Sequence, residues 1–251
     1  MADPATLEPT KLTYLEDTYL FELTTVFTGQ GIGTKGQFLT FSETILYPKG
    51  GGQPSDFGRV QLGDDVSFDI TYVEYDGASG VARHFIKGVD GVIANLEEIV
   101  GSPATLHVDS QRRLANARAH TAGHLLADVV SSLAPELQGK LGNHDPIEGC
   151  YVKFHGLLTS VPAAEFPSLV NAKLAEILLV PRGVDSRLAT DGAEGSGPEG
   201  KARRLVQIEG FEPSPCGGTH IRSLAEISSL ICTKAAIVKK ENVTKISYTV
   251  A

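Results

Sequence analysis

The sequence predicts an α+β protein, in which a small N-terminal β-barrel precedes an α/β domain. Short β-rich segments, separated by Gly, Asp and Pro, fill about the first hundred residues at a density typical of a small closed or nearly closed barrel. After His107 the pattern changes to helical segments alternating with strands. We therefore expect a barrel domain over residues 1–104 and an α/β domain over residues 105–251, since a chain of 251 residues has room for two modest domains.

The expected barrel strands combine β-branched and aromatic residues and end in turn residues. They cover residues 19–29, 37–48, 57–63, 66–77, 80–88 and 104–109. Between the first two strands, Gly31, Gly33 and Gly36 match the GxGxxG pattern of dinucleotide-binding sites. A strand pattern follows these glycines where such a site requires a helix, so we expect a hairpin loop there.

A long helix is expected to follow the barrel. Asp109 or Ser110 can cap its start, and it ends near Leu133, before Pro135. Four of its residues share one face, which we expect to pack on a core: Leu114, Thr121, Leu125 and Val129.

Further elements of the α/β domain follow this helix. A second helix is expected within residues 163–180, before Pro181, and a Gly-rich loop is expected over residues 190–203. Residues 204–210, 235–240 and 245–250 have strand patterns.

Composition narrows the function classes. A formal charge of −8 argues against a broad, nonspecific hold on nucleic acid, although local basic clusters remain. The sequence has no apolar run of the ~18 residues that span a membrane, and no secretory signal at its start. Its three cysteines, Cys150, Cys216 and Cys232, do not make a disulfide framework. We expect a soluble, cytoplasmic protein.

Two pairs of metal-binding residue types share one spacing. His120 and His124 lie one turn apart on the expected helix, and Cys216 and His220 repeat the four-residue spacing in a Gly- and Pro-rich turn. Imidazole and thiolate are ligands that zinc prefers, so the two pairs predict a tetrahedral zinc site. A zinc protease would carry Glu directly after the first histidine, where this chain has Thr121, so that class is excluded.

A third motif is "YPKGGGQPSDFG", residues 47–58. Consecutive glycines cost conformational entropy to order, so they indicate either a flexible hairpin or close approach of the backbone to a neighbouring group. The segment lacks the GxxxxGK[ST] pattern and the following helix of a phosphate loop.

Three motifs in fixed order, "GGGQPSDFG", "RRLANARAHTAGHLL" and "PCGGTHI", resemble the editing domain of alanyl-tRNA synthetase and its free-standing relatives of the AlaX type. The resemblance covers nearly the whole chain. It implies a trans-acting hydrolase that deacylates mischarged tRNA(Ala), with serine, and in some members glycine, as the amino acid removed. The fold that it implies is a small β-barrel joined to an α/β editing domain similar to that of threonyl- and alanyl-tRNA synthetases.

The resemblance also implies site residues. It carries Zn²⁺ ligation onto His120, His124, Cys216 and His220, and a place beside the editing pocket onto the glycine motif. For that pocket we expect Gly51, Gly52, Gln53 and Thr121. The chain departs from the family at Gly123, where a bulkier residue is common, and at "LAEISS".

Basic residues near these motifs are candidates, from charge alone, to meet tRNA phosphates: Arg112, Arg113, Lys201, Arg203 and Arg204. Neither DNA nor a membrane is expected as a partner. Two alternatives stay open, namely a zinc-structured tRNA-binding module without activity and a hydrolase for another misacylated tRNA.

Overall fold

The structure is a computed structural model that describes residues 8–63, 66–88, 95–189 and 204–251. The Gly-rich loop expected over residues 190–203 lies outside these described residues. The chain divides into two compact units, Met1–Gly50 with Pro54–Arg113, and Gly51–Gln53 with Leu114–Ala251. Residues 51–53 therefore belong with the C-terminal part of the chain, although barrel strands flank them in sequence. The expected domain boundary between residues 104 and 105 stays a prediction.

The first unit contains a closed antiparallel barrel, as the sequence predicted. Its strands follow the order β2-β3-β7-β6-β5-β8. Their bounds are β2 (Glu22–Gly33), β3 (Gly36–Phe41), β5 (Gly58–Leu62), β6 (Val66–Asp76), β7 (Val81–Ile86) and β8 (Pro103–Val108). Two short parallel strands, β1 (Lys11–Leu12) and β4 (Glu43–Thr44), accompany it. The expected hairpin loop is confirmed, because Gly33 pairs with Gly36 at the end of the β2–β3 ladder.

Alternating inward side chains fill the barrel. Phe27, Leu39, Phe41, Val60 and Leu106 are fully buried there, as the period of two along a strand requires. The single strand expected over residues 37–48 is interrupted, since β3 ends at Phe41 and β4 begins at Glu43. Short 3₁₀ helices occur at Thr13–Leu15 and Leu96–Ile99.

A buried ion pair ties the end of this unit to its core. Arg113 and Asp56 both have side chains that are 0% exposed, and the guanidinium bonds the carboxylate through Nε at 2.8 Å and also through Nη2. Arg113 also donates to the carbonyl oxygens of Thr18, at 2.9 Å, and of Ile45. A charge so deeply buried requires such a set of partners.

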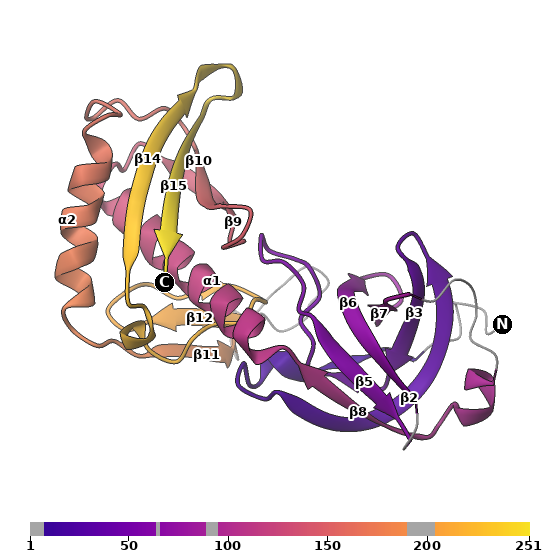
Figure 1. Cartoon of the computed structure of the whole chain (residues 1–251). Coiled ribbons are helices and arrows are strands. Elements are labelled where there is room, and N and C mark those ends of the chain that lie inside the picture. Colours follow the sequence, from indigo (N-terminus) through magenta and orange to yellow (C-terminus); the bar gives the residue numbers. More distant parts are fainter. Residues whose placement is uncertain (1–7, 64–65, 89–94, 190–203) are drawn as a thin grey trace. The chain divides into compact units, whose positions relative to one another are not determined.

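The second unit contains most of helix α1 (Ser110–Leu133) and helix α2 (Phe166–Leu178). Its four-stranded sheet has the order β14-β15-β10-β9, and α2 lies alongside β14 (Figure 1). The strands are β9 (Gln138–Asn143), β10 (Cys150–His155), β14 (Leu230–Val238) and β15 (Val243–Val250). A three-stranded sheet joins β11 (Val184–Leu188), β12 (Arg204–Ile208) and β13 (Ser214–Pro215), and 3₁₀ turns occur at Leu224–Glu226 and Lys239–Glu241.

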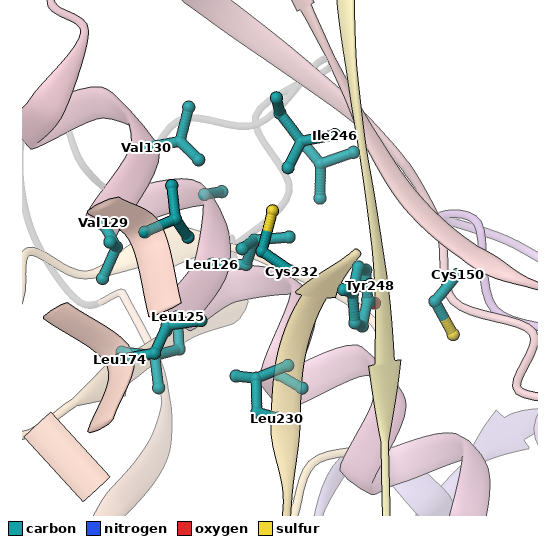
Figure 2. Packing of buried hydrophobic residues seen from close by; sticks show 14 of the residues in the cluster. Leu125, Leu126, Val129, Val130, Cys150, Leu174, Leu230, Cys232, Ile246 and Tyr248 are labelled. Atoms are coloured by element: carbon teal, nitrogen blue, oxygen red, sulfur yellow. The ribbon is translucent and has the colours of Figure 1, made fainter. Parts of the chain in front are cut away.

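Helix α1 packs on the sheet with the face that the sequence predicted. Thr121, Leu125 and Val129 are buried, and Leu114 is half-buried. Figure 2 shows side chains of α1, α2 and the sheet interdigitating in one apolar cluster. Among the described residues, no helix combines the length and the apolar character needed to cross a bilayer.

Candidate metal centre

Two pairs of side chains from distant parts of the sequence meet in the second unit. One potential ligand atom from each of His120, His124, Cys216 and His220 lies within 4.8 Å of all the others. Helix α1 supplies the first pair on successive turns, and the loop after β13 supplies the second pair. The four residues that spacing singled out are therefore brought together.

The sulfur of Cys216 lies close to two of the imidazoles. Its Sγ is 3.4 Å from Nε2 of His120 and 3.3 Å from Nε2 of His220. The imidazole rings are mutual neighbours, with centroids 4.6 Å apart for His120 and His220 and 5.2 Å apart for His120 and His124. The backbone N–H of Gly218 donates to the Cys216 sulfur at 3.4 Å, a contact that favours a thiolate.

Gln53 bonds Nδ1 of His120, the ring nitrogen that does not face the Cys216 sulfur. Its Oε1 lies 2.8 Å from His120 Nδ1 and accepts from the backbone N–H of Thr219 at 3.1 Å. A backbone N–H can only donate, so the amide atom that it meets must be oxygen. The same oxygen then accepts from Nδ1–H of His120, and this tautomer directs the Nε2 lone pair of His120 toward the sulfur.

The other two imidazoles have equivalent supports. Nδ1 of His220 lies 3.0 Å from Oγ1 of Thr121, whose hydroxyl donates to the carbonyl of Ala117 at 2.9 Å and so accepts from the imidazole. Nδ1 of His124 lies 3.0 Å from the Ser214 hydroxyl. Three neutral side chains thus hold the Nδ1 atoms, an arrangement that orients histidines for metal binding through Nε2.

Burial favours the neutral imidazoles that such binding requires. It holds the pKa of His120 and of His220 well below the usual 6.5, and the neighbouring imidazoles lower both values further. Three neutral nitrogen donors and one sulfur donor at these separations fit a divalent transition metal ion, so the residues present suit such a group.

The consecutive glycines mark a close backbone approach, one of the two readings that the sequence left open. Gly51 and Gly52 have φ angles of 52° and 79°, a region that favours glycine. A Cβ on Gly52 would lie 2.1 Å from the carbonyl oxygen of Gly142, so no side chain fits there. The turn delivers Gln53, which is 0% exposed, to the centre.

The expected pocket residues have structural contacts of their own. Thr121 is fully buried, and its hydroxyl also accepts from the backbone N–H of Ile221 at 3.3 Å. Gln53 donates from Nε2 to the hydroxyl of Thr219 at 2.9 Å. Both side chains are therefore held in place by the surrounding chain, and each bonds Nδ1 of one histidine, Gln53 that of His120 and Thr121 that of His220.

The basic residues are placed differently from one another. Arg113 is buried in its pair with Asp56, so its guanidinium is not at the surface. Arg112 is half-buried, with Cζ 3.8 Å from the ring centroid of Phe57. Arg204 donates to the carbonyls of Cys216, at 3.0 Å, and of Gly218, at 2.8 Å, and so braces the metal-site loop. Lys201 and Arg203 lie outside the described residues.

Sequence reasoning missed two residues next to the centre. Ser214 precedes Cys216 by two positions, and only the pairing of β13 with β12 brings its hydroxyl to His124. His144 has no partner at ligand spacing in the sequence, yet its ring stacks on that of His120. Its histidine side chain was the only signal in the sequence.

Comparison with known proteins finds relatives that are named as alanyl-tRNA editing proteins or as alanine–tRNA ligases. The alanyl-tRNA editing protein AlaX-M of Methanosarcina barkeri is 30% identical over 83% of this chain and 87% of its own length. AlaX-M of Methanosarcina acetivorans is 30% identical over 93% of this chain and 96% of its own length. The alanine–tRNA ligase of Ignicoccus hospitalis is 28% identical over 88% of this chain, a match that spans 24% of the ligase. No model of a protein family matches the chain.

Proposed function

Since the chain belongs to the AlaX family of alanyl-tRNA editing proteins, we propose that it hydrolyses the ester of mischarged tRNA(Ala) in trans. Serine is the proposed amino acid, with glycine second, and the tRNA acceptor end is the proposed partner. A cytoplasmic site of action follows from this substrate. We further propose that the second unit is an editing domain similar to that of threonyl- and alanyl-tRNA synthetases.

The observation that carries the proposal is the set of three imidazoles and one thiol with supported Nδ1 atoms. His120, His124, Cys216 and His220 are the proposed ligands of Zn²⁺, which prefers such a set. When bound, zinc supplies Lewis acidity beside the ester. Gln53 and Thr121 fix the tautomers of His120 and His220, and Ser214 bonds Nδ1 of His124, so that the three rings are held in place for binding through Nε2.

Ester hydrolysis also needs a bounded pocket. The turn at Gly51 and Gly52 lies against the backbone of Gly142, and Gln53 follows it into the centre. We propose that this turn forms one side of the pocket for the aminoacyl group. Lys201, Arg203 and the half-buried Arg112 remain the candidates for phosphate contacts, from their charge alone.

The test is deacylation of Ser-, Gly- and Ala-tRNA(Ala) by the metal-loaded protein. Editing requires fast turnover of the seryl ester and slow turnover of the correct alanyl ester. Cys216→Ala abolishes turnover, and His155→Ala, at an exposed histidine on β10, is the matched control that keeps it.

Two outcomes would favour the alternatives. Tight binding of tRNA without turnover of any ester indicates a zinc-structured tRNA-binding module. Equal rates on all three esters would refute proofreading of tRNA(Ala) and indicate a hydrolase of broader or different specificity.

A further inference from the structure

His144 lies just after β9, beside the centre but outside the ligand set. Its side chain is 5% exposed. The imidazole stacks face to face on the ring of His120, with centroids 4.5 Å apart and planes inclined by 17°. The His144 imidazole therefore covers one face of the His120 ring, while Gln53 bonds Nδ1 at the edge of that ring.

Hydrogen bonds fix the ring of His144. Its Nδ1 lies 2.7 Å from the hydroxyl of Tyr248, and that hydroxyl donates its proton to the carbonyl of Ala119 at 2.8 Å. Because a tyrosine hydroxyl has one proton, it accepts from Nδ1–H of His144. The backbone N–H of His144 donates to the carbonyl of Gly52 at 2.7 Å, so the main chain is anchored as well.

Two glycines leave the space that this ring occupies. A Cβ on Gly123 would lie 2.3 Å from Cε1 of His144 and 2.8 Å from the hydroxyl of Tyr248. A Cβ on Gly142 would lie 2.0 Å from Nε2 of His144. Glycine inside a helix is unfavourable relative to alanine, so its presence within α1 at position 123 has a packing explanation in His144.

We propose that His144 is a positioning residue of the metal centre. Fitted between Gly123 and Gly142 and bonded to Tyr248, it fixes the plane of the His120 ring and so the direction in which Nε2 of His120 meets a bound metal ion. This inference rests on the proposed metal site and adds to it a support that the ligand spacing does not contain.

The alternative is that His144 only fills space. Metal affinity and the spectrum of the bound metal distinguish a positioning role from a space-filling role. A residue that only fills the core affects folding and leaves the geometry at His120 unchanged. Co²⁺ is the probe, since its ligand-field absorption reports the geometry of its donors. Chelator competition gives its dissociation constant, and far-UV circular dichroism checks the fold.

We expect His144→Ala to bind Co²⁺ roughly 10- to 100-fold more weakly, the usual effect of removing an outer support, with a shifted spectrum. His144→Phe keeps the stacking but loses the bond to Tyr248, so it recovers part of the affinity. Gly123→Ala displaces the ring and weakens binding in the same way. Combined with His144→Ala, it adds little further loss, because the two closest contacts of the new Cβ, both with the imidazole, have gone and the contact of 2.8 Å with the Tyr248 hydroxyl remains. His155→Ala is the control that changes neither quantity.

Unchanged affinity and spectrum in folded His144→Ala would overturn the inference. Should that variant fail to fold, Gly123→Ala and Tyr248→Phe decide, since both retain the imidazole, and wild-type behaviour of both refutes the positioning role. Co²⁺ binding that depends on His144 without hydrolysis of Ser-tRNA(Ala) refutes the proposed function alone. Hydrolysis with Co²⁺ binding independent of His144 refutes this inference alone.

Discussion

Replacement of Arg113 by methionine tests the structural role of a residue whose charge also suggested tRNA contact. In the folded barrel unit, burial raises the pKa of Asp56, and the Arg113 charge opposes that rise. Without the guanidinium, we expect the Asp56 carboxyl to stay protonated in the folded state at pH 7. The unfolded chain ionises it with the ordinary pKa of 3.8.

The cost follows from this difference. Keeping a carboxyl neutral about three pH units above its ordinary pKa costs about 4 kcal/mol, at about 1.4 kcal/mol per unit. The loss relative to wild type is smaller than this, because the wild-type pKa of Asp56 is itself raised. An acid whose folded-state pKa is raised binds more protons when folded, so its contribution to stability falls as pH rises. The loss relative to wild type therefore shrinks by about 1.4 kcal/mol per unit as pH falls toward the wild-type pKa of Asp56.

Hydrogen exchange of barrel peptides, measured by mass spectrometry at pH 7 and pH 5, gives the free energy of opening of this unit alone. Arg59→Met is the matched control, because Arg59 and Asp69 form an exposed pair at 3.0 Å with side chains 59% and 57% exposed, for which we expect less than about 1 kcal/mol. A loss as small as the control's, or one equal at both pH values, would refute the reasoning.

Three further predictions concern the centre and the barrel. Gln53→Leu removes the side-chain oxygen that accepts from Nδ1–H of His120, so we expect metal binding to weaken roughly 10- to 100-fold. Gln53→Glu keeps an acceptor, so its loss of metal affinity is smaller. Chelator competition measures the metal affinity of both variants. Cys216→Ala loses both metal binding and deacylation activity. Removal of the metal from the wild type with a chelator abolishes deacylation until Zn²⁺ is restored. A Cys216→Ala variant that retains metal binding and deacylation contradicts the four-ligand set. Burial lowers the pKa of His84 to about 4 from 6.5, so its neutral form favours folding above pH 6.5 and the barrel loses stability as pH falls toward 4. Exchange at pH 5 should show about 2 kcal/mol of loss that His84→Gln lacks.

Residue spacing predicted the cluster of four candidate ligands because each pair is local. His120 and His124 meet on one helix face, and Cys216 and His220 share one loop. The density of short β-rich segments between turn residues likewise predicted a small closed or nearly closed barrel, since each segment is recognised from its own residues. These features depend on short stretches of chain.

Features that depend on distant chain segments could not be predicted. Ser214 meets His124 across 90 positions, and His144 reaches His120 only through the geometry of β9 and β15. Charge alone did not distinguish Arg113, which is buried, from Arg112, which is half-buried beside it. Whether an arginine side chain is buried depends on tertiary packing, which the neighbouring residues in the sequence do not determine.

The turn at residues 51–53 has a consequence for dissecting the protein. A fragment cut at residue 105 would retain all the candidate ligands but lose Gln53, which accepts hydrogen bonds from both His120 and Thr219 across intervals of 67 and 166 positions. Two buried N–H groups would then lack an acceptor, each at about 1–3 kcal/mol. The part of the chain that carries the four candidate ligands therefore does not contain the whole candidate site, and a graft onto another scaffold must supply the glycine turn as a separate loop.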